Sequence, residues 1–164
     1  TKTSFVMEQN INRDKELIAS ADIHLVSVNS DGKPTKIPEI LKNGGGAIVN
    51  NASIAGLIGS RNASIYCASK HGVIGLTKAV ALEQATGGIR INTVCPGLIQ
   101  TDIIERAFAQ IDDSEAKAQI VAVYPIGRIG QPEEIANAVV WLCSDAASFI
   151  TGHSLTIDGG CTVQ

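Results

Sequence analysis

Tyr66 and Lys70 are the two residues whose types and spacing most directly suggest chemistry. They are four positions apart in a run that predicts a helix, so both side chains should lie on one helix face. A tyrosine hydroxyl ordinarily titrates at about pH 10, and a nearby ammonium group favours its phenolate form. Ser53 lies 13 residues before Tyr66 and offers a neutral hydroxyl that could orient a substrate oxygen. Together the three groups could exchange a proton with a carbonyl or an alcohol.

A Tyr-x-x-x-Lys spacing also arises by chance on surface helices, so the spacing alone does not identify an enzyme. The composition, however, argues against several other classes of function. The net charge is -3 and the 13 Lys and Arg residues are scattered, which favours a neutral or modestly polar small molecule over nucleic acid. No apolar run reaches the roughly 20 residues of a membrane span. The first residues do not open a secretory signal, so we expect no membrane partner and a cytoplasmic location.

The cysteines are too far apart to suggest a metal site. There is no Cys-x-x-Cys pair and no histidine at metal-ligand spacing beside any of them, so no metal is expected. We interpret them as reduced thiols of the protein core. The four are Cys67, Cys95, Cys143 and Cys161.

Beyond residue 44 the sequence alternates between predicted strands and helices. The strands are expected at 47–51, 89–95 and 155–157, and the helical stretches at 64–85, 101–123 and 132–143. This alternation predicts an α/β fold, with three parallel strands joined by right-handed crossovers. The apolar face of the first long helix is expected to comprise Val73, Leu76, Val80 and Leu82.

The first 42 residues have a different pattern. Residues 4–11 and 16–29 read as an antiparallel β-hairpin, followed by turn residues at 30–34 and a short helix at 38–42. The expected division is therefore a hairpin segment at 1–42 and an α/β segment at 43–164. The hairpin could pair along the open edge of the three-stranded sheet, or a second copy of the chain could cover that edge.

Four segments resemble the short-chain dehydrogenase/reductase family in order and spacing. They are NASIAG at 51–56, YCASKHG at 66–72, IRINTVCPG at 89–97 and IDGG at 157–160. The resemblance covers about residues 44–164 and implies the C-terminal half of a Rossmann-type sheet. It also implies hydride transfer between NAD or NADP and a carbonyl or secondary alcohol, and assembly into a homo-oligomer.

The resemblance assigns a role to each matching residue. Tyr66 would be the general acid/base, Lys70 would favour its phenolate and bind the nicotinamide ribose, and Ser53 would position the substrate. Asn92 would be structural, and the histidines would be packing or surface residues. The catalytic set is thus Ser53, Tyr66 and Lys70, and the cofactor-binding set is Tyr66, Lys70, Pro96, Gly97, Ile99 and Thr101.

The part of the family pattern that holds most of the cofactor is not found. No strand, glycine-rich turn and helix follow one another, because Gly44-Gly45-Gly46 precedes a strand instead of opening a helix. Binding of NAD or NADP by this chain alone is therefore doubtful, and the choice between them cannot be predicted. Asn29 matches the letters of a family asparagine, but the stretch after it is too short for the helix that should follow. The substrate region at 103–124 carries no charge cluster that selects a substrate.

Residues 3–40 show a second resemblance, to the C-terminal strands of a hotdog-fold acyl-CoA thioesterase. The chain could therefore be a chimera joined between Ile37 and Gly46. Three hypotheses follow: a short-chain oxidoreductase, a non-catalytic chimeric or truncated fragment with an idle active-site motif, and, third in rank, a thioesterase.

Overall fold

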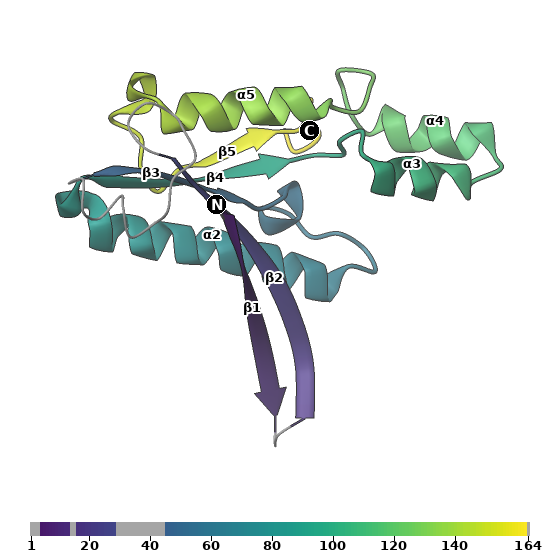
Figure 1. The fold of residues 1–164 in the computed structure, drawn as a ribbon. Helices are drawn as coiled ribbons and strands as arrows, with labels where there is room; N and C mark the ends of the chain where they lie inside the picture. The colour runs from purple at the N-terminus through teal and green to yellow at the C-terminus, as the bar shows by residue number, and fades with distance from the viewer. Residues whose placement is uncertain (1–3, 14–15, 29–44, 164) are drawn as a thin grey trace.

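The computed structural model describes residues 4–13, 16–28 and 45–163, and five strands form one sheet in these parts of the chain (Figure 1). The sheet order follows the chain order, β1-β2-β3-β4-β5. β3 pairs parallel to β4, and β4 parallel to β5, which confirms the predicted three parallel strands. The strands are β1 (Ser4–Arg13), β2 (Glu16–Val28), β3 (Gly46–Asn51), β4 (Ile89–Pro96) and β5 (Ser154–Ile157).

Helices cover both faces of the parallel strands. α2 lies along one face and α5 along the other, while α3 and α4 lie beyond the carboxyl end of β4 (Figure 1). This layering is the α/β class predicted from the alternation of strands and helices. The helices are α2 (Ser64–Gln84), α3 (Asp102–Ala109), α4 (Ser114–Ala122) and α5 (Pro132–Cys143), with short 3-10 turns η1 (Ile54–Gly56), η2 (Ala85–Gly87) and η3 (Asp145–Ala147).

Alternate residues of β4 pack against different helices. Val94 lies in an apolar cluster with Leu142 of α5, whereas its neighbour Cys95 lies in a cluster with Val73 and Ile74 of α2. Successive side chains of a strand point to opposite faces, so a strand covered on both sides needs buried residues at every position. The parallel arrangement brings the carboxyl ends of β3, β4 and β5 to one edge of the sheet, where their loops meet.

The predicted hairpin is present, and it pairs with the open edge of β3. β1 and β2 are antiparallel, and the last four residues of β2 pair antiparallel with β3, from Leu25 opposite Asn50 to Val28 opposite Ala47. The remainder of the hairpin extends away from the sheet as a two-stranded arm (Figure 1). The predicted turn at 30–34, Asn29 and the helix at 38–42 lie outside the described residues.

The prediction that Leu82 belongs to the apolar face of α2 is wrong. Leu82 is 83% exposed, whereas the buried residues of the helix include Val73, Thr77 and Ala81. Leu82 is nine positions after Val73. At about 100° per residue, its side chain lies half a turn around the helix from Val73, on the face opposite the core. Within the described residues, no helix is both long enough and apolar enough to cross a membrane.

Candidate active site

Ser53 lies at the carboxyl end of β3, where it begins the short turn η1. Its Oγ accepts a hydrogen bond from the backbone N of Ala55 at 3.2 Å, which leaves the hydroxyl proton available to another acceptor. η1 packs closely on α2, since a Cβ added to Gly56 would lie 2.8 Å from the carbonyl oxygen of Lys70. This close approach holds Ser53 beside the helix that carries Tyr66 and Lys70.

Tyr66 and Lys70 lie in the first two turns of α2, and their side chains meet as the spacing predicts. Lys70 Nζ lies 5.6 Å from the centroid of the Tyr66 ring and donates a hydrogen bond to the carbonyl oxygen of Asn51 at 3.2 Å. Burial lowers the pKa of Lys70, and the nearby Cys95 acts in the opposite direction. An ammonium partly removed from water acts on its neighbours with less screening. Tyr66 itself is 49% exposed, so its hydroxyl is accessible to a ligand.

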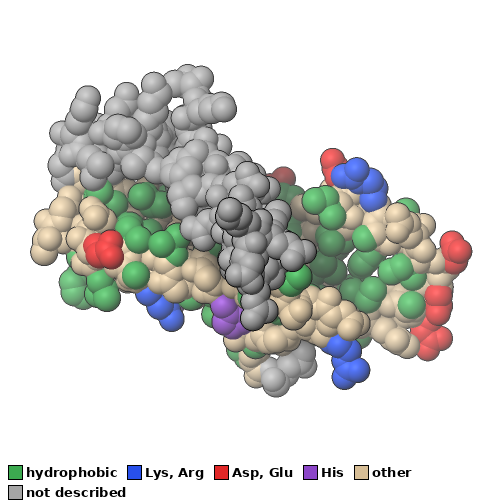
Figure 2. All heavy atoms as spheres, turned by 90° about the horizontal axis from the view of Figure 1, so that it is seen from below, with side chains coloured by type: hydrophobic (Ala, Val, Ile, Leu, Met, Phe, Trp, Pro, Cys, Tyr) green, Lys and Arg blue, Asp and Glu red, His purple; other side chains and the backbone are tan. Residues whose placement is uncertain are grey.

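A cavity of about 520 Å³ lies at this edge of the sheet. Five of the predicted site residues line it, namely Ser53, Tyr66, Gly97, Ile99 and Thr101. Lys70 and Pro96 are not among its described lining residues, because Lys70 lies behind Tyr66 against Asn51 and Pro96 is still part of β4. In the view from below, hydrophobic side chains surround a hollow toward the end of the molecule where α3 and α4 lie (Figure 2).

The hydroxyl of Thr101 lies at the cavity and makes no hydrogen bond to the helix that follows it. The residue occupies the N-cap position of α3, where a threonine side chain often binds the first backbone amides of the helix. Here it makes no such hydrogen bond, and only its carbonyl oxygen is used, accepting from Glu105 N at 2.8 Å. The hydroxyl is therefore free to bind a ligand amide or hydroxyl.

Behind the cavity, Asn92 has the structural role expected for it. The side chain is fully buried, its Nδ2 donates to the carbonyl oxygen of Ile150 at 2.9 Å, and its Oδ1 accepts from the backbone N of His153 at 3.0 Å. Asn92 thereby joins β4 to the segment that leads into β5. His71 is exposed, and its Nδ1 lies 2.9 Å from the carbonyl oxygen of Cys67, as expected of a surface residue.

The other residues that line the cavity include Tyr124, which sequence reasoning placed only at the end of the substrate region, and Cys161, which it placed in the core. Three cysteines are buried as expected, but Cys161 is only half-buried, so its interpretation as a core residue is wrong. It follows Gly159 and Gly160, whose φ angles of 58° and 86° form a left-handed turn after β5. This glycine pair was the available signal that the chain turns there, toward the edge of the sheet.

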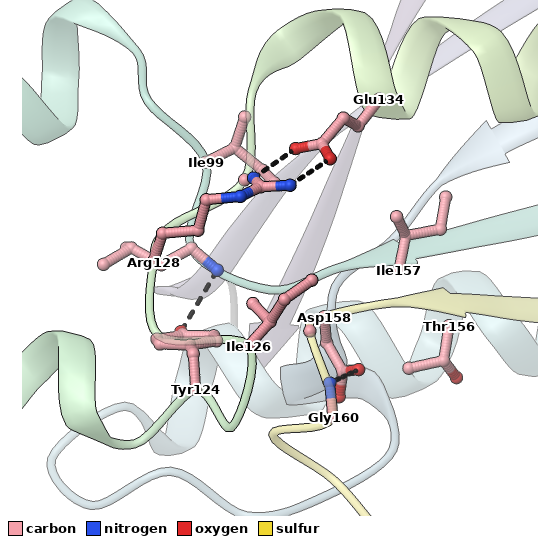
Figure 3. A pocket seen from close by; sticks show the side chains of 12 residues that line it. Ile99, Tyr124, Ile126, Arg128, Glu134, Thr156, Ile157, Asp158 and Gly160 are labelled. Atoms are coloured by element: carbon pink, nitrogen blue, oxygen red, sulfur yellow. Dashed lines mark hydrogen bonds and ion pairs between the residues drawn. The ribbon is translucent and has the colours of Figure 1, made fainter.

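A second, smaller cavity of about 330 Å³ adjoins the first and shares Leu98, Ile99 and Tyr124 with it. Arg128 and Glu134 form a two-point ion pair at its border, with distances of 2.8 and 2.7 Å (Figure 3). Glu134 also accepts a hydrogen bond from the backbone N of Gln131 at 2.7 Å. The hydrogen bonds from Arg128, which have the largest effect, and the one from Gln131 lower the pKa of Glu134 to about 2. The pair fixes the loop that leads into α5. Among the described residues, no cluster of His, Cys, Asp or Glu side chains is arranged to hold a metal ion.

Comparison with known proteins identifies relatives of this arrangement. The family model described as enoyl-(acyl carrier protein) reductase matches residues 19–162. Cyclohexanol dehydrogenase of Acinetobacter sp. (strain SE19) is 56% identical over 127 residues, which are 77% of this chain and 47% of the relative. A protein of Xanthobacter autotrophicus (strain ATCC BAA-1158 / Py2) named inactive 2-(S)-hydroxypropyl-CoM dehydrogenase 2 is 47% identical over 118 residues, covering 71% of this chain and 51% of the relative.

A solved structure described as ElxO with NADP bound has the same fold. It superimposes with a TM-score of 0.71 at 39% identity, covering 78% of this chain and 51% of the other. The chain thus spans about half the length of the relatives that it matches. The family match begins at residue 19, so it extends into the segment that resembles a hotdog fold. The motifs, the three parallel strands and these matches show that the chain belongs to the short-chain dehydrogenase/reductase family.

Proposed function

We propose that this chain carries the proton-transfer site of an NAD(P)-dependent oxidoreductase that interconverts a carbonyl and a secondary alcohol. The observation that carries the proposal is that Ser53 and Tyr66 line one cavity, with the Lys70 ammonium 5.6 Å from the Tyr66 ring. The relative named cyclohexanol dehydrogenase and the NADP-bound structure support the same assignment.

In this proposal each residue has a separate task. The nicotinamide, when bound, supplies or accepts the hydride. Tyr66 gives its hydroxyl proton to the carbonyl oxygen as that oxygen becomes an alcohol, and in the reverse direction it takes the proton back. Ser53 donates a hydrogen bond to the same oxygen and fixes its position. Lys70 stabilises the phenolate form of Tyr66.

The residues around the cavity also fit the nicotinamide end of the cofactor. The free hydroxyl of Thr101 suits the carboxamide group, and Gly97 and Ile99 provide a narrow wall against which a flat ring can lie. Pro96 fixes the start of that wall and Lys70 would bind the ribose. The apolar lining favours an uncharged substrate with a hydrocarbon portion; it includes Ile54, Ile58, Ile104 and Val123.

Assembly and location belong to the same proposal. A homo-oligomer is supported by large apolar side chains left exposed, such as Phe149, at 103% of its reference area, and Leu82. A cytoplasmic location and a division at residues 42 and 43 follow from the sequence reasoning. The hotdog-like origin of residues 3–40, and with it a chimera, stays a prediction, and the family match from residue 19 weighs against it.

The test combines cofactor titration with one substitution. NADH and NADPH are titrated against the purified chain, and turnover is measured with a panel of apolar ketones and secondary alcohols. Tyr66→Phe should leave the cofactor dissociation constant within about twofold and lower turnover by about 10²- to 10⁴-fold, because only the proton chemistry is lost. Equal turnover in the two proteins would refute the role of Tyr66.

The second candidate is a chain that keeps the motif without catalysis. The relative that is named inactive favours it, since 47% identity there accompanies a protein described as having no activity. This candidate predicts no binding of NADH or NADPH at millimolar concentration. Such a result would exclude the oxidoreductase for the 164-residue chain.

A further inference from the structure

Tyr124 connects two parts of the site that are far apart in sequence. It follows the end of α4, is half-buried, and lines both the active-site cavity and the smaller cavity beside it. Its Oη accepts a hydrogen bond from the backbone N of Leu98 at 3.1 Å (Figure 3). Leu98 belongs to the loop after β4, so a side chain from the α3–α4 region holds a backbone amide of this loop.

The ring of Tyr124 also fixes the residue before Leu98. A Cβ added to Gly97 would lie 2.9 Å from Tyr124 Cε1 and 3.1 Å from the Cα of Asp158, so neither side of the loop has room for it. The backbone N of Gly97 donates to the carbonyl oxygen of Ile157 at 3.0 Å. Gly97 is therefore enclosed by the tyrosine ring and by the end of β5.

Tyr124 is itself held firmly enough to serve as a support. Its backbone N donates to the carbonyl oxygen of Val121 at 2.9 Å, and its carbonyl oxygen accepts from Gly127 N at 2.8 Å. The same turn is tied to the end of the sheet, because Ile126 N donates to the carbonyl oxygen of Gly159 at 3.1 Å. Burial raises the pKa of Tyr124, so its hydroxyl stays neutral at physiological pH.

We propose that Tyr124 is a positioning residue for the nicotinamide end of the cofactor site. Its hydroxyl and ring fix the position of the backbone at Gly97 and Leu98. This stretch of backbone lines the same cavity as Tyr66. Tyr124 transfers no proton and acts only through this loop. The inference rests on the proposed function, because the loop needs an accurate position only if a cofactor binds against it.

The chain has two tyrosines, which makes a crossed experiment possible. Tyr124→Phe and Tyr66→Phe each remove one hydroxyl oxygen and keep the ring. For both variants and the wild type, we would measure the NADPH dissociation constant, turnover at saturating NADPH and ketone, the melting temperature, and the hydrogen-exchange rate of the Leu98 amide by NMR. Exchange is measured without cofactor, so it reports on the loop directly.

The two variants should give opposite results. Tyr124→Phe should weaken NADPH binding about five- to tenfold and speed exchange at Leu98, because one hydrogen bond to the loop is lost. Its turnover at saturation should stay within about threefold of wild type. Tyr66→Phe should leave the NADPH dissociation constant within about twofold of wild type, leave Leu98 exchange as in the wild type, and lose turnover. Gly97→Ala places a methyl group against the Tyr124 ring and so displaces the loop from the opposite partner of this contact. It should weaken NADPH binding at least as much as Tyr124→Phe.

The outcomes separate this inference from the proposed function. If the wild type binds NADPH and Tyr124→Phe binds it equally well, Tyr124 has no positioning role. The role is also excluded if Tyr124→Phe lowers the melting temperature while Leu98 exchange and NADPH binding stay as in the wild type. If the wild type binds neither NADPH nor NADH, the proposed function fails, and the positioning role toward a cofactor fails with it.

Discussion

Two polar side chains of β4, Arg90 and Asn92, differ from two at the cavity, Ser53 and Thr101, in how far their hydrogen bonds are already used. Inside, Arg90 donates to the carbonyl oxygens of Leu142 and Ser144 at 2.7 and 3.1 Å, and Asn92 is bonded through both of its polar atoms. Around the cavity, Ser53 uses only its acceptor oxygen, and the Thr101 hydroxyl caps no helix. Arg90 and Asn92 thus join segments of the fold, whereas Ser53 and Thr101 keep a hydroxyl proton that a ligand in the cavity can accept.

The largest effect is expected where both hydrogen bonds of a buried side chain are lost. Asn92→Ala leaves the amide of His153 without its partner and the carbonyl of Ile150 with only the longer bond from Arg90 at 3.5 Å, so we expect the free energy of unfolding to fall by about 2–4 kcal/mol. Urea denaturation measures this directly. Asn137→Ala is the control, because Asn137 is exposed on α5 and should change stability by less than about 0.5 kcal/mol. Equal losses in the two variants would show that Asn92 does not join β4 to the segment before β5.

A smaller effect, on catalysis and not on stability, is expected at the cavity. Ser53→Ala removes a hydroxyl whose donor is free for the substrate oxygen, so turnover should fall about 10- to 100-fold. Ser144→Ala is a matched control, because Ser144 directly follows α5, outside the cavity lining, and its hydroxyl also bonds a backbone group at a helix end, donating to the carbonyl oxygen of Trp141 at 2.8 Å. Turnover in the control should equal wild type. Full activity of Ser53→Ala would remove Ser53 from the site.

The smallest effect is expected for a buried hydroxyl that bonds nothing. Thr93 is fully buried, and its Oγ1 has no hydrogen-bond partner among the described residues. Thr93→Val should therefore leave the free energy of unfolding unchanged or raise it by up to about 1 kcal/mol.

Thr77 provides the comparison for this last prediction. It is equally buried, but its hydroxyl accepts from Asn50 Nδ2 at 2.7 Å and donates to the carbonyl oxygen of Val73 at 2.8 Å. Thr77→Val should cost about 1–3 kcal/mol in the same urea experiment. If both valine variants lose stability equally, a satisfied hydroxyl is worth no more than an unsatisfied one in this protein.

The sequence was most informative where local patterns determine structure. The helix expected from near Pro132 to about Cys143 is found at Pro132–Cys143, because proline suits a first helical turn and indicates the start. The meeting of Tyr66 and Lys70 followed from a four-residue spacing on one helix. Ser53 was placed at the end of its strand, and the structure adds that it starts η1.

The omissions at the site come from contacts between distant segments, whereas the error at Leu82 is local to its helix. Tyr124 bonds an amide 26 residues earlier in the chain, and no local pattern predicts such a contact. Cys161 lines the cavity only because the turn at Gly159 and Gly160 directs it there. Leu82 was assigned to the core by its residue type, although its position on the helix places it opposite Val73.

The pairing of β2 with β3 has a consequence for how the molecule opens. Only four residue pairs join the two strands, whereas six pairs join β3 to β4 and helices cover both faces of the parallel strands. Local opening free energies follow the number of contacts that must break, so the hairpin is expected to detach in a partial unfolding step while the parallel strands stay folded. Detachment exposes the backbone groups of β3, and an unpaired strand edge readily pairs with a strand of another chain. The four-pair junction between the hairpin and β3 is thus the place where strand exchange between copies would begin.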